Sequence, residues 1–337
     1  MVSAEASLAA TWSWSVRSTK QQQAAGPSST RSSQQRNMAS SLTPLAATMN
    51  DPIPAKEISV SGRFLKIARL RHEWCDFVDD PETFIRQLRG GSTKASVFTF
   101  VSEIDDRHLA LPYQKEMNSV AVLPVSTFDE WWRDLGNKKR NQIRKAEKSG
   151  IQLRIVQLDA AFADGVESIY SETKIRQGRR FYHYGKKSPE LKEELGSVLD
   201  RCLLVGAYYQ QELVGFMKLY EGRNVLRAIN IIAKVKHRDK CVMDALIAKG
   251  VELCGQRGIH QLHYGSWTDG GVGAFREKHG FQRLEVPRYF VPLTFMGRVM
   301  LMLNLHRPAR QRLPRSWTRQ LMMIRTKWNS WRFGESH

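Results

Sequence analysis

Three short apolar runs follow one another between residues 203 and 233, and they constrain the fold most strongly. The runs read LLVGAYY, LVGFMKLYE and VLRAINIIA, and only three residues separate each run from the next. Runs of this length, rich in Val, Ile, Leu and Tyr and bounded by polar residues or glycine, are typical of β-strands. They predict three consecutive strands that form a meander within one sheet.

Amphipathic helices and further strands surround these three runs. Phe162, Val166, Ile169 and Thr173 recur at i, i+4, i+7 and i+11, which predicts a helix with one apolar face. In chain order the predicted elements are a strand over 151–158, helices over 159–174 and 191–202, the three strands above, a helix over 239–258, a strand over 261–264, a helix over 275–279 and a strand over 283–293. This β–α–α–β–β–β–α–β–α–β order predicts an α/β (α+β) fold in which helices flank a mixed β-sheet.

The chain before residue 151 carries weaker signals. Apolar runs at 96–104 and 119–125 predict strands. A helix is predicted over 127–149 with a break at Gly136, and its second part carries six Lys and Arg residues. Because 337 residues allow about two globular units, we expect a degenerate N-terminal unit at 51–136 and a complete C-terminal unit at 137–294.

Both ends of the chain differ from the middle in composition. Residues 1–50 are rich in Ser, Ala, Gln and Thr, and we predict a disordered or non-native leader there. After Thr294 we expect the chain to leave the fold, so that residues 295–337 form a tail. Five apolar residues of this tail fall at helical spacing among arginines: Trp317, Leu321, Ile324, Trp328 and Trp331. The pattern predicts a basic amphipathic helix that docks on an anionic membrane surface or packs on the protein itself.

The charge balance is strongly basic. The chain holds 52 Lys and Arg against 33 Asp and Glu, for a net charge of +19. Such an excess favours anionic partners: a phosphate-bearing ligand, nucleic acid or an anionic membrane. The four cysteines show no paired spacing and no metal-ligand cluster appears, so we predict neither a disulfide framework nor a metal site. Reduced cysteines and the lack of an apolar run near 18 residues indicate a cytoplasmic location, at the inner face of the membrane if the tail docks there.

Three segments carry a resemblance to a known superfamily. ELVGFMKLYEGRNVLRAINIIA (212–233) leads into a predicted helix, and GVGAFREKHGFQRLEVPRYFVPLT (271–294) closes the pattern. With the order of elements, they resemble the GNAT acyltransferase superfamily. The basic segment NKKRNQIRKAEKSGIQLRIV (137–156) is similar to the linking helix of the branch that pairs two GNAT-like units in one chain, which includes the Fem-type aminoacyl transferases.

The resemblance implies a donor site at residues 232–244. In GNAT enzymes a splayed strand presents backbone N–H groups to the acyl group, and the N-terminus of the next helix binds the CoA pyrophosphate. The residues that correspond here are Ile232, Ala233, Lys236, His237, Arg238 and Lys240. The family pattern R/Q-x-x-G-x-G/A places Cys241 and Met243 where small residues are usual, and glycine there allows close approach to the pyrophosphate. These two departures keep a tRNA-borne donor open, which Fem-type members use.

The resemblance also assigns the loop KIRQGRRFYHYGKK (174–187) to the acceptor. Its arginines suit an anionic group and its aromatic residues suit a sugar or an amine. The predicted acceptor-binding residues are Arg176, Arg180, Tyr182, Tyr184, Asn230 and Trp267. Acyl transfer needs an acid and a base near the splayed strand. Tyr264 is the predicted acid, and His263, His183 or a water held by Asp269 is the predicted base.

Together these features predict an N-acyltransferase that moves an acyl group, such as acetyl, from acyl-CoA to an amine. The acceptor would be a small molecule such as an amino sugar or a cell-envelope precursor. One alternative is a Fem-type transferase that uses aminoacyl-tRNA. The other is a non-catalytic GNAT-like module that binds a membrane surface or nucleic acid.

Overall fold

The computed structural model describes residues 58–62, 66–73, 75–91, 93–108, 110–176 and 179–306. The predicted leader and the part of the predicted tail after His306 lie outside these residues. Eight α-helices are described: α1 (Pro81–Gly90), α2 (Phe128–Asp134), α3 (Asn137–Lys148), α4 (Ala160–Tyr170), α5 (Ser188–Gly196), α6 (Val242–Gln256), α7 (Gly271–Glu277) and α8 (Phe295–Met302). Within the described residues, no helix is long and apolar enough to cross a membrane.

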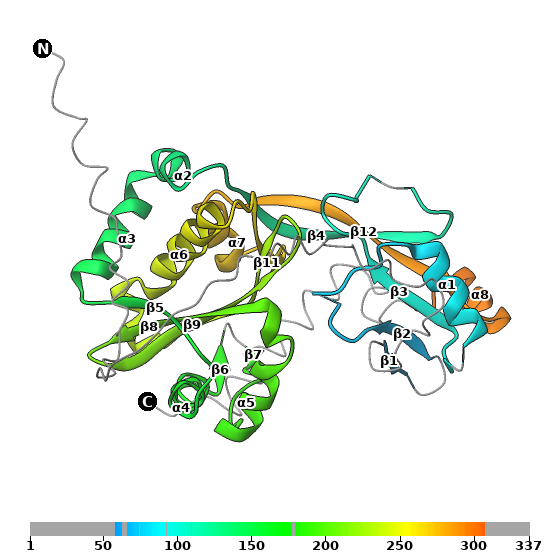
Figure 1. The fold of residues 1–337 in the computed structure, drawn as a ribbon, viewed down its shortest axis with the longest axis horizontal. Coiled ribbons are helices and arrows are strands. Elements are labelled where there is room, and N and C mark those ends of the chain that lie inside the picture. Colours follow the sequence, from blue (N-terminus) through cyan, green and yellow to red (C-terminus); the bar gives the residue numbers. More distant parts are fainter. Residues whose placement is uncertain are drawn as a thin grey trace, which may run out of the picture. The chain divides into compact units, whose positions relative to one another are not determined.

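Ten strands form one mixed sheet, in the order β1-β2-β3-β12-β4-β11-β10-β9-β8-β5 (Figure 1). Its strands are β1 (Ile58–Ser61), β2 (Ile67–Leu70), β3 (Val97–Val101), β4 (Gln114–Pro124), β5 (Gln152–Val156), β8 (Cys202–Tyr209), β9 (Glu212–Glu221), β10 (Leu226–Ala233), β11 (Gln261–Ser266) and β12 (Gln282–Pro292). The short strands β6 (Ile175–Arg176) and β7 (Arg179–Arg180) pair separately. The predicted mixed sheet with flanking helices is confirmed.

The order of elements predicted for residues 151–294 is also observed. The predicted meander is β8-β9-β10, in which each strand pairs with the next in antiparallel fashion. The predicted break at Gly136 separates α2 from α3. The loop before α5 differs, because it contains the small β6-β7 hairpin, which the sequence pattern did not predict.

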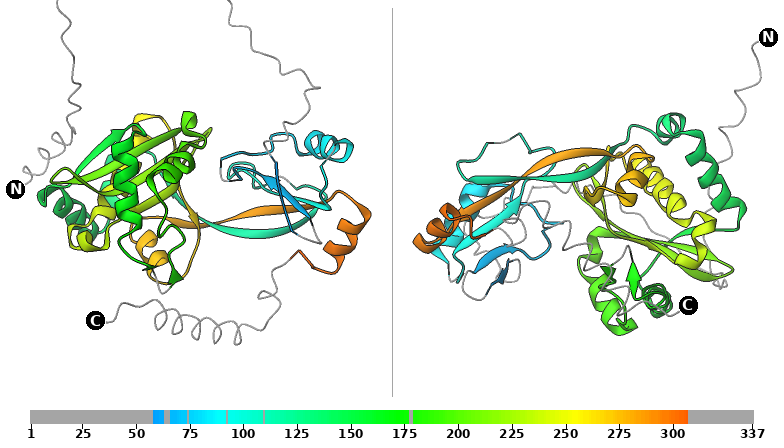
Figure 2. Two further views of the ribbon diagram at one scale, coloured as in Figure 1. Left: turned by 90° about the horizontal axis from the view of Figure 1, so that it is seen from below. Right: turned by 180° about the vertical axis from the view of Figure 1, so that it is seen from behind.

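Helices cover both faces of the sheet around β9 (Figures 1 and 2). On one face α6 packs so closely that a Cβ atom on its Gly250 would lie 3.2 Å from Leu262 and 3.4 Å from Met217. On the other face α4 places Phe162 and Tyr170 against Phe216. The helix α4 begins where Asp159 accepts a hydrogen bond of 2.7 Å from the Phe162 N–H, so a capping residue and an apolar face together fix it.

The closing strand β12 lies between β3 and β4 and so joins strands β1–β3 to the rest of the sheet. It pairs with β4 from Gln282 to Phe290 and with β3 from Arg288 to Pro292. Tyr289 is fully buried and lies 5.5 Å from the ring of Phe100. The segment that closes the predicted pattern is therefore a core strand, as the sequence predicted.

The chain does not leave the fold directly after Thr294. The apolar run that follows forms α8, which begins where Thr294 accepts a hydrogen bond of 3.1 Å from the Gly297 N–H. A Cβ atom on Gly297 would lie 1.8 Å from the Ser96 carbonyl oxygen, so only glycine allows this approach. Met300 and Leu301 are buried beside Val97 and Phe290. Burial of these apolar residues therefore makes α8 part of the fold, whereas the sequence pattern predicts a tail from residue 295.

Candidate active site

The parallel strands β10 and β11 separate soon after they meet. They pair only at Leu226 with Leu262 and at Arg227 with His263, although β10 continues to Ala233. On its other edge, β10 stays paired with β9 as far as Ala233. From Ala228 onward the strand therefore faces β11 without pairing to it, which leaves backbone N–H and C=O groups available to a ligand.

A β-bulge lies at the point where the strands separate. The pairing of β10 with β9 shifts between Ala228 and Asn230, so Ile229 is the extra residue. Bulges redirect side chains and are frequent next to active sites. After this bulge Asn230 hydrogen-bonds the hydroxyl of Tyr170 on α4, which brings the helix to the open strand.

The junction between β10 and α6 has the backbone conformation that glycine favours. A 3₁₀ helix, Val235–Lys240, is followed by Cys241 at φ 55° and ψ 35°, and α6 then begins at Val242. This left-handed conformation is uncommon for residues other than glycine. Cys241 is the position where the GNAT pattern has its first glycine. The backbone shape is thus kept although the residue differs, and Met243 occupies the second small-residue position in the first turn of α6.

The Glu212 carboxylate pairs with basic side chains at this junction. Its carboxylate lies 2.5 Å from Lys234, 2.9 Å from Lys236 and 3.6 Å from His237. Lys240 lies 3.4 Å from Asp239 and over the ring of Tyr209, whereas Arg238 is exposed. Three of the four predicted phosphate-binding residues, Lys236, His237 and Lys240, therefore already face a carboxylate.

This cluster gives the protein an acid-sensitive contact. Hydrogen bonds from Lys234 and Lys236 lower the pKa of Glu212 from 4.5 to about 2. A depressed carboxyl pKa stabilises the fold above the unfolded-state pKa, and this contribution is lost as the pH falls through the folded-state value. We expect Glu212→Gln to be less stable than the wild type at pH 7 and equally stable near pH 2. Urea unfolding across this range measures the gap, and a gap that did not shrink on acidification would contradict the assignment.

Arg176 and Glu172 hold the end of β10 and the residues after it in place through hydrogen bonds. The Glu172 carboxylate accepts hydrogen bonds from the backbone N–H groups of Val235 (2.6 Å) and Lys236 (2.9 Å), and it pairs with Arg176 at 3.3 Å. Arg176 in turn donates to the Ala233 carbonyl at 3.0 Å. Arg176, predicted to bind the acceptor, thus fixes the backbone of the predicted donor residues.

The predicted acid and one predicted base are neighbours on β11. His263 belongs to the last β10–β11 pair, and Tyr264 is the first residue beyond it. Burial raises the pKa of Tyr264, so its phenol is protonated at neutral pH. Burial, together with the nearby Arg227 and Arg276, lowers the pKa of His263 to about 3. So weakly basic an imidazole is a poor general base, which favours His183 among the predicted bases.

His183 and Asn230 both contact Tyr170. The His183 ring lies 4.6 Å from the Tyr170 ring, and Asn230 hydrogen-bonds the Tyr170 hydroxyl. Burial lowers the pKa of His183, against the opposing effect of Glu194 at 3.6 Å. Tyr170 itself was not predicted as a site residue, because its position in the repeat of α4 indicates only a core residue.

Of the remaining predicted acceptor residues, Tyr182 lies beside this group, with its ring centroid 5.1 Å from that of His183. Tyr182 is 79% exposed, with Lys186 over its ring. Arg180 is exposed, and Tyr184 is half-buried. Trp267 is half-buried after β11, where its backbone N–H donates to the Ser119 carbonyl at 2.8 Å.

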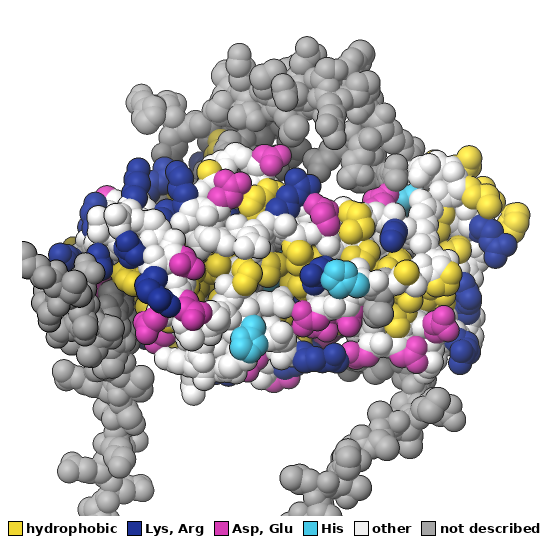
Figure 3. All heavy atoms as spheres, turned by 90° about the horizontal axis from the view of Figure 1, so that it is seen from above, with side chains coloured by type: hydrophobic (Ala, Val, Ile, Leu, Met, Phe, Trp, Pro, Cys, Tyr) yellow, Lys and Arg dark blue, Asp and Glu magenta, His cyan; other side chains and the backbone are white. Residues whose placement is uncertain are grey.

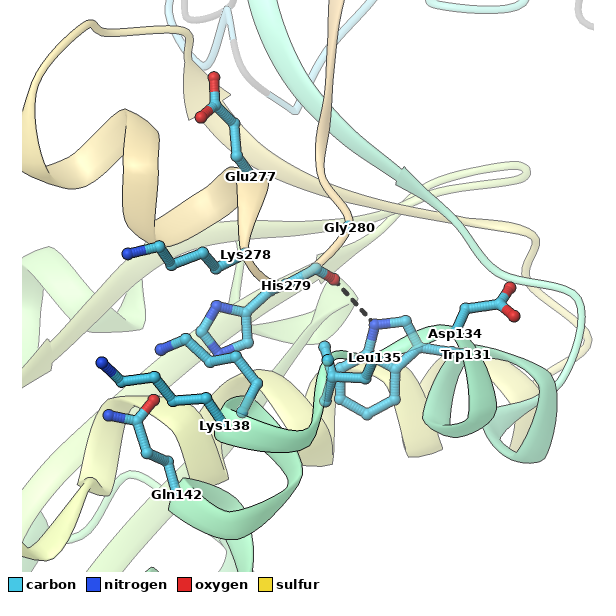
Figure 4. Close-up of a pocket in the computed structure, with 11 residues that line it drawn as sticks. Trp131, Asp134, Leu135, Lys138, Gln142, Glu277, Lys278, His279 and Gly280 are labelled. Atoms are coloured by element: carbon cyan, nitrogen blue, oxygen red, sulfur yellow. Dashed lines mark hydrogen bonds between the residues drawn. The ribbon is translucent and has the colours of Figure 1, made fainter.

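A pocket of about 540 Å³ lies between the α2–α3 segment and the turn after α7 (Figure 4). Residues from both segments line it, among them Trp131, Lys138, Gln142, Lys278 and His279. The side chains of Lys138, Lys278 and Gln142 project to the same side, whereas Glu277 and Asp134 point away from them (Figure 4). The Trp131 indole N–H donates a hydrogen bond of 2.9 Å to the His279 carbonyl, which connects the two segments that line the pocket.

A buried triad of Lys139, Asp244 and His279 connects this pocket to the junction. Lys139, which lines the pocket, lies 2.6 Å from Asp244 in the first turn of α6, and His279 lies 3.1 Å from the same carboxylate oxygen. The triad was missed by the sequence analysis. One signal was present, because Asp244 is a carboxylate among the apolar residues that begin α6.

No protein-family model matches the chain, and no curated protein sequence is significantly similar to it. Among solved structures, FemX aligns with a TM-score of 0.53 at 10% identity over 73% of this chain and 85% of its own. This similarity supports the fold. The fold is GNAT-like. The L-PGS from Bacillus licheniformis aligns with a TM-score of 0.49 at 15% identity, covering 73% of this chain and 84% of its own. The PaiA N-acetyltransferase from Thermoplasma acidophilum, solved with coenzyme A, aligns with a TM-score of 0.33 at 16% identity. The alignment covers 42% of this chain and 98% of the PaiA chain.

Proposed function

We propose that the chain is an acyltransferase that moves an acyl group from acyl-CoA to an amine. The observation that carries this proposal is the separation of β10 from β11 after two residue pairs, together with the bulge at Ile229. An acyl carbonyl needs hydrogen-bond donors that are already oriented where negative charge develops. The unpaired edge of β10 supplies such donors without any movement of the chain.

In this proposal the acyl donor approaches from the α6 side of the junction. Cys241 has the backbone conformation of a glycine, so the N-terminus of α6 can approach a phosphate as it does in GNAT enzymes. Because Lys236, His237 and Lys240 already face carboxylates, further cations are needed. Lys138 and Lys278 meet this need, since both are exposed beside the pocket and neither forms an ion pair with another described residue.

The acceptor amine would lie on the opposite face, near Tyr170, His183 and Asn230. Tyr264 would protonate the leaving thiolate, and His183 would accept the proton of the attacking amine. His263 stays neutral at physiological pH because of its low pKa and would act through its packing. Each role is a hypothesis that substitution tests one residue at a time.

A Fem-type transferase that uses aminoacyl-tRNA is the second candidate. One observation favours it: Glu172 occupies the N–H groups of Val235 and Lys236, and Glu212 occupies the Lys236 side chain. These contacts reduce the number of N–H groups and positive charges that the junction can offer to a pyrophosphate. Basic residues elsewhere, such as the exposed Lys138, Arg144, Lys145 and Lys148 of α3, would then contact RNA phosphates.

Binding of the donor separates the two candidates. Isothermal titration of the full chain with acetyl-CoA should give measurable binding, and Cys241→Gly should bind about as tightly or more tightly because glycine accepts the same φ without strain. Arg238→Glu should weaken this binding. A chain that bound aminoacyl-tRNA in a salt-sensitive manner and did not bind acetyl-CoA would overturn the CoA proposal in favour of the second candidate.

A further inference from the structure

Exposed apolar side chains gather on α8 and the turn that follows it. Ten large hydrophobic residues are exposed in the described part of the chain, and half of them lie within eleven residues. They are Phe295, Met296, Met302, Leu303 and Leu305, with exposed fractions between 38% and 78%. We call these five residues the α8 patch. Soluble proteins rarely leave so many neighbouring apolar side chains in water unless the surface binds something.

The other side of α8 is fully used in packing. Met300 and Leu301 are buried with Val97 and Phe290, and Gly297 lies against the Ser96 carbonyl. The helix therefore has one apolar side inside the protein and a second apolar side in solvent. Burial within the described fold explains the first side and leaves the second without a structural role.

Three cations lie on α8 or on segments next to it. Arg298 is exposed on α8 itself, Arg89 donates to the Pro292 carbonyl at the end of β12, and Lys94 is exposed two residues before Ser96. Within the described residues, none of these three forms an ion pair. Figure 3 shows hydrophobic side chains together with Lys and Arg side chains in the part of the molecule where Figure 1 places α8.

We propose that the α8 patch docks on an anionic lipid membrane. Its apolar side chains would insert among the acyl chains near the headgroups, and Arg298, Arg89 and Lys94 would contact lipid phosphates. Apolar insertion and attraction to anionic lipid together give peripheral membrane binding. The sequence that follows supports the same partner, because residues 298–337 hold nine basic residues and one acid.

Charge disfavours two other partners for the patch. A second copy of the chain would bring an equally basic molecule with net charge +19 to a symmetric contact, so Arg298 and its neighbours would face like charges. The chain's own residues 307–337 are also basic, with eight Lys and Arg against one acid. An anionic surface is the partner that neutralises these charges rather than adding to them.

Vesicle co-sedimentation of the full chain tests this proposal. The wild type should bind vesicles of phosphatidylcholine with phosphatidylglycerol about tenfold or more tightly than vesicles of phosphatidylcholine alone. The variant Phe295→Glu/Leu303→Glu should lose about tenfold or more of its binding to the anionic vesicles. The matched control is Ile155→Glu on β5, which replaces a side chain that is 53% exposed and should bind as the wild type does.

Three results would overturn the proposal. The first is a double variant that binds anionic vesicles as tightly as the control does. The second is a wild type that is a dimer without lipid while the double variant is a monomer, since a second copy would then cover the patch. The third is a double variant with a Tm well below that of the Ile155→Glu control, which would show that the chain itself covers the patch. Each readout is independent of acyl transfer.

Discussion

Replacing Asp244 with alanine should lower the free energy of unfolding by about 3–5 kcal/mol, because it leaves a buried cation without its partner. The Lys139 ammonium lies 2.6 Å from the Asp244 carboxylate, and their side chains are only 9% and 8% exposed. Burial by itself would raise the pKa of Asp244, but hydrogen bonds from His279 and Lys139 outweigh burial and lower it. The carboxylate is therefore ionised in the folded protein, and its loss leaves the Lys139 charge uncompensated.

Two further variants separate a buried-charge effect from general damage. Lys139→Met/Asp244→Leu removes both charges and fills similar volume, so it should recover most of the stability that Asp244→Ala loses, with the remaining deficit due to buried His279, which no longer has its partner. Lys138→Met changes an exposed neighbour on the same helix and should alter stability by less than about 0.5 kcal/mol. Urea unfolding followed by circular dichroism measures all three variants. An Asp244→Ala variant as stable as Lys138→Met would show that the triad does not stabilise the fold.

Replacing Tyr264 with phenylalanine should lower kcat by about 10²–10⁴-fold, the usual contribution of a general acid. Tyr264 is the first residue of β11 beyond its last pair with β10, so it stands where the strands open. The Arg276 guanidinium lies 4.4 Å from its ring and Phe281 packs against the ring edge, so phenylalanine keeps these contacts. The loss should therefore appear in kcat with little change in KM for the acyl donor or in Tm.

Tyr113→Phe is the matched control for this prediction. Tyr113 is half-buried and packs against the core cluster that contains Ile85 and Phe98, not on β10 or β11, so kcat should stay within about twofold of the wild type. Thiol release from acetyl-CoA, followed with a panel of amines, gives the rates. Full activity of Tyr264→Phe would remove it from the mechanism, and the absence of any rate in the wild type would favour a non-catalytic binding module.

Local patterns in the sequence predicted the fold of the C-terminal part well. The three apolar runs became β8, β9 and β10, and the spacing of Phe162, Val166 and Ile169 became the buried face of α4. These elements are decided by periodicity over a few residues, which a sequence displays directly. The fate of the run after Thr294 was not decided in this way, because it depends on whether distant Ser96 leaves room for Gly297.

The candidate site was harder to predict because its properties arise between distant segments. Lys236 looked like a phosphate ligand in the sequence, but Glu212, 24 residues earlier, pairs with it. Arg176 looked like an acceptor ligand, but it donates to Ala233, 57 residues later. Conversely, the missing glycine at Cys241 suggested a lost phosphate site, whereas the backbone there keeps the left-handed conformation. Charge and composition predicted the region, and only tertiary contacts showed which groups remain available.

The β10–β11 opening is the feature on which the proposed function depends most. It is best tested by a crystal structure of the full chain with a non-hydrolysable acetyl-CoA analogue. We expect the analogue's carbonyl oxygen within hydrogen-bonding distance of a β10 backbone N–H between Ala228 and Ala233, with its pyrophosphate at the N-terminus of α6. An analogue bound elsewhere, with this edge of β10 left unoccupied, would contradict the proposed donor site.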